Sequence, residues 1–149
     1  MSQLTLVFPK HAALLSPDEI YEKVDQELLA VFKEVRRLER KPAGTHFDAL
    51  GDYFAMWANT LPEGGLLVVG MENDGSFSCH RLSQNQLNEI EKCHQTFCPD
   101  ASVESKWVPV AASDGTESFV IVFRVRYRED KVATTAAGRA FTPRSPFSG

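Results

Sequence analysis

The sequence predicts a single domain of mixed α/β (α+β) class, in which about three helices flank one mixed sheet. Three patterns predict this class. Helix-start signals precede apolar residues at helical spacing, one unbroken apolar run suits a strand covered on both faces, and a late run alternates apolar and charged residues. A chain of 149 residues suits one hydrophobic core, so residues 1–149 are assigned to one domain.

A first helix is predicted over residues 17–33. Ser16 is followed at once by a proline and three residues later by Glu19, which is the pattern of a capping box with proline at the first helical position. Apolar residues then recur at helical spacing. We therefore expect one continuous helical segment before the sheet begins.

A short strand is predicted in the segment RRLERKP, residues 36–42, because a proline and then a glycine end it. Side chains alternate between the two faces of a strand. This period places Arg37, Glu39 and Lys41 together on one face.

The second helix is predicted over residues 45–60. Thr45 and Asp48 resemble a helix cap, His46 looks like a helix-start residue, and an apolar stripe of helical period follows. The stretch GGLLVVGM (64–71) comes next, and its unbroken apolar character predicts the central strand of the sheet.

The triplet Asn-Asp-Gly at 73–75 is a strong hairpin signal and predicts a return strand over 76–81. Ser83 and Gln86 then form another capping box, which predicts a third helix that ends before Pro99.

The last part of the chain predicts three strands. The first covers 103–110 and leads to a turn at 113–115. The second is the long run SFVIVFRVRYRED (118–130), and a short final strand covers 138–142.

The composition is that of an ordinary globular protein with a basic end. The net charge is −4, yet six of the residues between 124 and 144 are arginine or lysine against two acids, which favours a local surface that faces a polyanion. Three cysteines suit free thiols in a reducing compartment. No convincing signal peptide or membrane-length apolar run occurs, so we expect a soluble, cytoplasmic protein with no membrane partner.

Glu34, Glu39 and Lys41 form the first candidate site. A divalent cation that cleaves phosphodiesters needs converging carboxylates, and a nearby lysine can balance the phosphate charge. Glu39 and Lys41 share a strand face, and Glu34 at the helix exit can bend toward it. On spacing alone, a solvated charge cluster is the commoner explanation.

The stretch MENDGS (71–76) is the second candidate, because it ends the predicted central strand and open sheets bind ligands at strand carboxyl ends. Glu72 or Asp74 can add a third carboxylate. The alternative is that Asp-Gly serves only as a hairpin turn.

Three arginines on one face of the long strand, Arg124, Arg126 and Arg128, are the third candidate, and Arg139 and Arg144 follow them. Guanidinium groups suit phosphate oxygens and can follow a nucleic-acid backbone without reading bases. The alternative is the charged, solvated face of an edge strand.

A zinc site is a weaker possibility. Cys93, His94 and Cys98 lie near Cys79, but their spacing is not that of a CxxC motif. Because Cys93 and His94 fall within the predicted third helix, packing in the core is the preferred interpretation.

The order of these segments resembles the Schlafen AlbA_2 (divergent AlbA, AAA_4) domain family, in particular prokaryotic Schlafen-like proteins. The resemblance rests on EVRRLERKP, FAMWANTLPEGGLLVVGMENDGS, SFVIVFRVRY and the terminal GRAFTPRSP, and it spans about residues 30–145. It implies a mixed α/β nucleic-acid-binding domain. In Schlafen relatives this domain is an endoribonuclease that uses three acidic residues and a divalent cation.

The resemblance implies roles for particular residues. Glu34 and Glu39 match the first two acids and Lys41 the neighbouring lysine, which implies Mg²⁺ or Mn²⁺ as the cofactor. The third acid is open, since Asn73 lies near the expected aspartate with Glu72 and Asp74 on either side. Arg37 and Arg144 are further candidates for contact with nucleic acid.

Two functions are therefore predicted. The first is a metal-dependent endoribonuclease, a hydrolase acting on structured RNA such as tRNA. The second is a non-catalytic DNA- or RNA-binding module of a regulatory or defence protein. The resemblance also implies a homodimer, because Schlafen cores pair two related lobes.

Overall fold

The computed structural model describes residues 15–31, 37–112 and 114–138. Four strands form one sheet in the order β1-β2-β4-β3. They are β1 (Leu38–Lys41), β2 (Gly65–Val69), β3 (Ser102–Ala111) and β4 (Glu117–Arg126). β1 runs parallel to β2, whereas the pairs β2–β4 and β4–β3 are antiparallel. The predicted mixed α/β class is confirmed.

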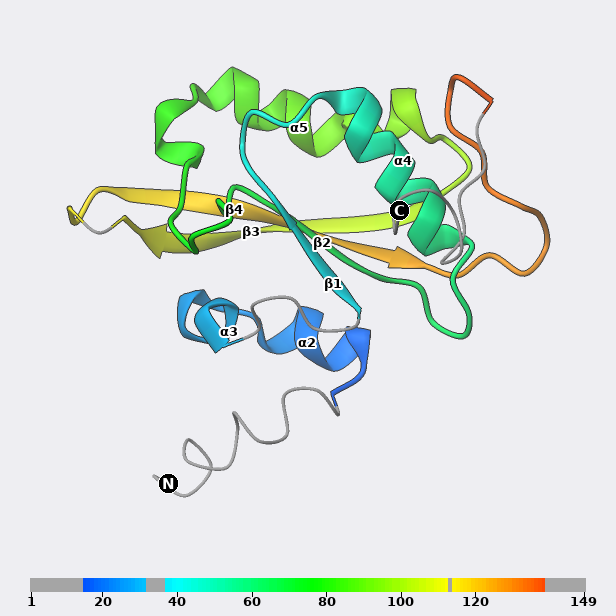
Figure 1. Cartoon of the computed structure of the whole chain (residues 1–149), viewed down its shortest axis with the longest axis horizontal. Coiled ribbons are helices and arrows are strands. Elements are labelled where there is room, and N and C mark those ends of the chain that lie inside the picture. The colour runs from blue at the N-terminus through cyan, green and yellow to red at the C-terminus, as the bar shows by residue number, and fades with distance from the viewer. Residues whose placement is uncertain (1–14, 32–36, 113, 139–149) are drawn as a thin grey trace.

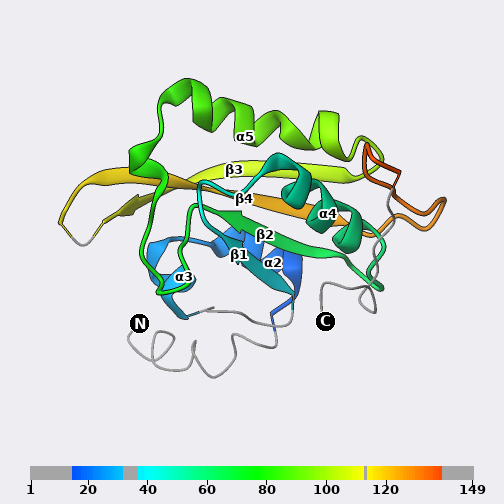
Figure 2. The same ribbon diagram turned by 45° about the horizontal axis from the view of Figure 1, so that its top comes forward.

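Helices cover both faces of this sheet (Figures 1 and 2). α4 (Phe47–Ala58) and α5 (Gln84–Phe97) lie on one face, and α2 (Pro17–Lys23) and α3 (Gln26–Val31) lie on the other. Each face has its own apolar cluster, because side chains alternate along β2 and β4. None of the helices in the described ranges is long and apolar enough to cross a membrane.

The predicted helix over 17–33 is wrong as one element, although its start is confirmed. Ser16 forms the predicted capping box with Glu19. The helix then stops at Lys23, and Asp25 starts α3 by accepting a hydrogen bond from the Leu28 N–H at 2.8 Å. An aspartate that caps a new helix competes with continuation of the old one, which an apolar pattern does not reveal. Residues 32 and 33 lie outside the described ranges.

The predicted strand in 36–42 is confirmed as β1, and the helix over 45–60 as α4 with shorter ends. Its N-cap is His46, in agreement with one prediction, whereas the cap predicted at Thr45 is wrong. The Thr45 hydroxyl instead donates to the Pro42 carbonyl at 2.8 Å, which closes the turn before the helix.

The predicted central strand is β2, which is buried throughout and pairs on both edges. The turn at 73–75 is also confirmed, since the Gly75 N–H donates to the Glu72 carbonyl. The return strand over 76–81 is wrong. Met71 and Phe77 form a single bridge, and the Ser78 N–H donates a hydrogen bond to the Gly70 carbonyl. A short 3-10 helix, η2 (Cys79–Arg81), then leads toward α5.

The third helix and the following strand are confirmed as α5, with its capping box, and as β3. β4 ends at Arg126, so the predicted extension to residue 130 is wrong. The chain leaves the sheet there because the Arg128 N–H donates to the Ala58 carbonyl at the end of α4. Of the predicted strand over 138–142, Gly138 lies in a turn and the rest lies outside the described ranges.

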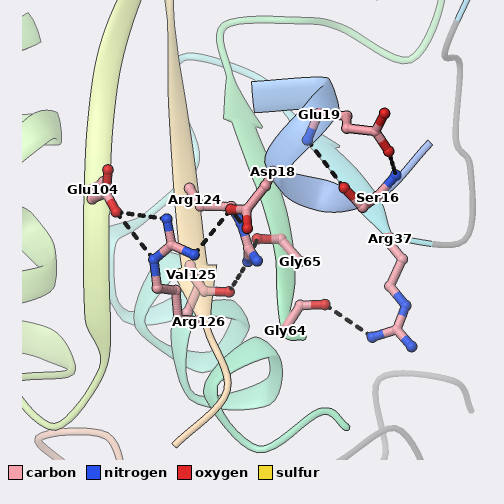
Figure 3. Close-up of polar contacts among 10 residues, drawn as sticks. All are labelled: Ser16, Asp18, Glu19, Arg37, Gly64, Gly65, Glu104, Arg124, Val125 and Arg126. Atoms are coloured by element: carbon pink, nitrogen blue, oxygen red, sulfur yellow. Dashed lines mark hydrogen bonds and ion pairs between the residues drawn. The ribbon is translucent and has the colours of Figure 1, made fainter. Parts of the chain in front are cut away.

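Arg124 is the most buried charged side chain of the described residues, with 2% of its surface exposed. It projects from the interior strand β4 toward α2, where its Nε donates to Asp18 at 2.9 Å (Figure 3). Its Nη1 donates to the carbonyl oxygens of Val125 and Gly65. A buried guanidinium needs such partners, so Asp18 ties α2 to the sheet.

The Asp18→Ala variant should lose about 2 kcal/mol of folding free energy, because it leaves the Arg124 guanidinium buried without its carboxylate. The half-exposed position of Asp18 keeps the loss below that of a fully buried pair. Urea unfolding measures it. The matched control is Asp130→Ala, which breaks the solvent-exposed pair with Arg128 and should destabilise the protein less than Asp18→Ala does.

The difference in unfolding free energy between wild type and Asp18→Ala should depend on pH. The hydrogen bond from Arg124 holds the pKa of the Asp18 carboxyl below its ordinary value. The stabilisation is therefore complete above the unfolded pKa of about 3.9 and is lost as pH falls through the lower folded value. This role of Asp18 would be contradicted if Asp18→Ala and Asp130→Ala lost equal unfolding free energy. It would also be contradicted if wild type remained more stable than Asp18→Ala at a pH below the folded pKa of Asp18.

Candidate functional site

The carboxyl ends of β1 and β2 lie at the same edge of the sheet because the two strands are parallel. The Lys41 carbonyl accepts hydrogen bonds from the N–H groups of Gly70 and Met71, at 2.8 and 3.2 Å. The structure therefore brings the end of the predicted Glu39–Lys41 strand against the start of the predicted 72–74 turn. Ligand sites of open α/β sheets favour this position.

Glu39 and Lys41 form a partly exposed pair on the α4 side of β1. The Lys41 Nζ lies 3.7 Å from the Glu39 carboxylate and 4.6 Å from the ring centroid of Tyr53 on α4. Leu38 points into the opposite apolar cluster, which confirms the predicted alternation. A lysine held between a carboxylate and an aromatic face is confined in position while a quarter of its side chain stays accessible to solvent.

Tyr53 was not singled out by the sequence reasoning. It lies outside the apolar stripe that predicted α4, so helical periodicity gave it no role. The signal that could have found it is an aromatic residue flanking that stripe on the helix that directly follows β1.

The three candidates for the third acid differ in their surroundings. The Asp74 carboxylate accepts hydrogen bonds from the Ser76 N–H at 2.9 Å and the Ser76 hydroxyl at 2.6 Å, and these bonds lower its pKa. Asp74 thus closes its own turn, as the hairpin alternative expects. Asn73 is exposed, whereas Glu72 is partly buried and lines a cavity.

That cavity, of about 470 Å³, lies between the 42–45 loop and a wall that includes Glu72 and Arg81. A second cavity of about 300 Å³ lies beside the N-terminal part of α5. The two cavities adjoin, because Leu82 and residues 43–45 line both, and together they are called the edge groove below. Its lining includes Pro42, the residue that directly follows Lys41 at the end of β1.

The predicted metal site is not assembled by the described residues alone. Across 15–31, 37–112 and 114–138, no three histidine, cysteine, aspartate or glutamate side chains gather where they could hold a cation. Glu34, the first predicted acid, lies outside these ranges. The donors that the structure describes near the edge are therefore Glu39 and Glu72, too few for a three-carboxylate site.

The cysteines and His94 belong to the core. Cys79, Cys93 and Cys98 are buried free thiols. His94 packs against the rings of Phe54 and Phe123, and burial lowers its pKa. This packing agrees with the core interpretation of these residues.

The prediction of an exposed arginine ladder is wrong for Arg124, which is buried beneath α2. Arg126 bridges Asp18 and Glu104, with nitrogen–oxygen distances of 2.9 and 2.8 Å (Figure 3). β4 is an interior strand, which also excludes the edge-strand alternative. The sequence signal for this arrangement is Glu104, placed in the strand that precedes the arginine-bearing one.

The remaining arginines have structural contacts as well. Arg128 pairs with Asp130 and donates to the Asp100 carbonyl. Arg37 donates to the carbonyl oxygens of Leu61 and Gly64, holding the loop before β2. Contact of Arg37, Arg126 and Arg128 with nucleic acid stays a prediction. Arg139 and Arg144 lie outside the described ranges.

No protein-family model matches this sequence, and no curated protein is significantly similar to it. The resemblance to the Schlafen AlbA_2 family therefore stays a prediction.

The three thiols should resist alkylation in the folded protein. Burial raises the pKa of Cys79 and Cys98 to about 11 and that of Cys93 to about 12. Only about one thiol in a thousand or fewer is then ionised at pH 8, and the thiolate is the nucleophile. Mass spectrometry after iodoacetamide treatment should show no modification without urea and three modifications with it. Rapid labelling of the native protein would contradict the buried placement.

Proposed function

We propose that this domain binds structured RNA such as tRNA and cleaves its phosphodiester backbone beside the Glu39–Lys41 pair, with Mg²⁺ or Mn²⁺ as cofactor. The observation that carries the proposal is the confined ammonium of Lys41, held between Glu39 and Tyr53 where two parallel strands end. It agrees with the E-x-K strand of the family that the sequence resembles.

Lys41 is the residue proposed to contact the phosphate. Its ammonium lies beyond hydrogen-bonding distance of the Glu39 carboxylate, at 3.7 Å, so the pair is an electrostatic contact rather than a closed hydrogen bond. A phosphate oxygen that approaches Lys41 gains a charge-assisted hydrogen bond. The same ammonium offsets the negative charge on the phosphoryl oxygens in the transition state of cleavage.

Glu39 is proposed to bind the cation and to orient the attacking water, together with Glu34 and an acid of the 72–74 turn. Glu72 is preferred over Asp74 because it lines the edge groove, whereas Asp74 closes its turn. When bound, the cation would supply Lewis-acid stabilisation of the phosphoryl oxygens. The proposed location is the cytoplasm, and a homodimer remains the predicted assembly.

The Glu39→Ala and Lys41→Ala variants should each cleave tRNA at least about 100-fold more slowly than wild type in Mn²⁺, because each loses a group that acts on the transition state. Gel analysis of end-labelled tRNA measures the rate. The matched control is Glu117→Ala, which removes an exposed glutamate at the start of β4 and should cleave normally. Cleavage that survives in both site variants, or that EDTA does not stop, would overturn the proposal.

A second function, nucleic-acid binding without cleavage, is favoured by one observation. The Asp74 carboxylate, one of the candidates for the third acid, accepts two hydrogen bonds from Ser76 and closes its own turn. In this case the chain serves as the binding module of a regulatory or defence protein, with Lys41 contacting phosphate.

Binding without cleavage predicts a particular salt dependence. Lys41→Ala should reduce the slope of log affinity against log salt concentration by about 1, because one phosphate contact is lost. Fluorescence anisotropy with labelled tRNA measures the slope. Lys92→Ala, which removes an exposed lysine from α5, is the control and should leave the slope unchanged. Equal slopes in wild type and Lys41→Ala would exclude Lys41 as a phosphate contact.

A further inference from the structure

The edge groove has walls that are held in place by short local contacts. The Ala43 N–H donates to the Ser78 hydroxyl at 3.2 Å, which joins the loop after β1 to the segment after β2. Thr45 braces the same loop through the Pro42 carbonyl. The groove is therefore formed before any ligand arrives, which lowers the entropy cost of binding.

The lining of the groove combines apolar surface with a few polar groups. Leu82, Ile90 and Phe47 supply apolar area, and the Phe47 ring is itself packed edge-on against Phe97, with centroids 5.8 Å apart. A flat ligand can bury its faces against such a surface. Unpaired bases of RNA are bound in this way, through apolar and aromatic contacts to their faces and hydrogen bonds to their edges.

The charged side chains that line the groove favour a nucleobase over a phosphate group as its ligand. Among the described residues that line it, Glu72 and Glu89 outnumber the one arginine, Arg81. An excess of carboxylate repels a phosphate group, but carboxylate oxygens accept hydrogen bonds from the exocyclic amino groups of cytosine, adenine and guanine. Uracil has no amino group to donate.

The groove also lies on the correct side of the sheet for a nucleotide next to the Glu39–Lys41 pair. Ala43 belongs to the apolar cluster under α4 and α5, the side on which Lys41 contacts Tyr53. Ala43 follows Lys41 by two residues, so their Cα atoms are at most about 7 Å apart.

We propose that the edge groove binds an unpaired nucleobase that carries an exocyclic amino group, next to the phosphate contacted by Lys41. This inference rests on the proposed function for its biological meaning. It narrows the substrate to RNA in which the cleaved bond adjoins an unpaired cytosine, adenine or guanine. Base binding to the groove is nevertheless a property that can be measured without cleavage.

Free nucleosides test the groove directly. Cytidine added to the methyl-labelled protein without metal should shift the NMR signals of Leu82, Ile90 and Thr45, and it should bind about tenfold more tightly than uridine. A Glu72→Ala/Glu89→Ala double variant should bind the two nucleosides about equally, since the acceptors for the amino group are gone.

A groove-filling variant provides the steric test. Gly44 lines both cavities, and a Cβ atom built on it meets no atom within 4 Å, so Gly44→Leu adds a bulky side chain to the groove lining without displacing the fold. It should abolish the cytidine-induced shifts. Gln95→Leu is the matched control, because it adds the same side chain to an exposed site on α5 beyond the groove, and its shifts should equal those of wild type.

The possible results separate the two proposals. If cytidine leaves the groove methyls unshifted, or if Gly44→Leu and the double variant bind like wild type, the groove proposal is overturned whatever the nuclease assay gives. If cytidine binds as expected but tRNA is not cleaved, the groove stands and the endoribonuclease proposal fails.

Discussion

The arrangement of this domain depends on one buried guanidinium. Arg124 lies near the end of an interior strand, and a buried positive charge there is tolerated because Asp18 and two carbonyl oxygens accept its hydrogen bonds. The need for a carboxylate at that point explains why α2 lies over β4, and with it α3 over the same face. Of the three arginines predicted to form a nucleic-acid surface, Arg124 is thus turned inward, whereas Arg126 stays partly exposed in its pairs with Asp18 and Glu104.

Because helices cover both faces of the sheet, the β1–β2 edge is a place where polar groups can meet a ligand. Parallel pairing of these strands puts both carboxyl ends together, and the hydrogen bonds to the Lys41 carbonyl join them. The 42–45 loop that follows β1 and residues of the segment that follows β2 line the edge groove. The groove and the charged pair are therefore consequences of the same strand pairing.

Much of the fold could be predicted because its signals are local. The capping boxes at Ser16 and Ser83 and the unbroken apolar run of β2 depend on residues a few positions apart, and all three were confirmed. The predicted element boundaries were wrong where a distant contact or a competing local hydrogen bond set the end of a helix or strand. Asp25 caps a new helix, α3, by accepting a hydrogen bond from Leu28. The Ala58 carbonyl accepts a hydrogen bond from the Arg128 N–H just after β4 ends.

For the candidate site, the sequence by itself determined which chemical groups are present: an E-x-K strand, an acidic turn and a set of arginines. Residue types and their alternation along a strand can be identified directly from the sequence. Only the tertiary structure decided which of them meet. Strand order made β4 an interior strand and buried Arg124, whereas parallel pairing placed Lys41 beside the turn that carries Glu72. Burial and partner choice depend on contacts between residues far apart in sequence, which no local pattern specifies.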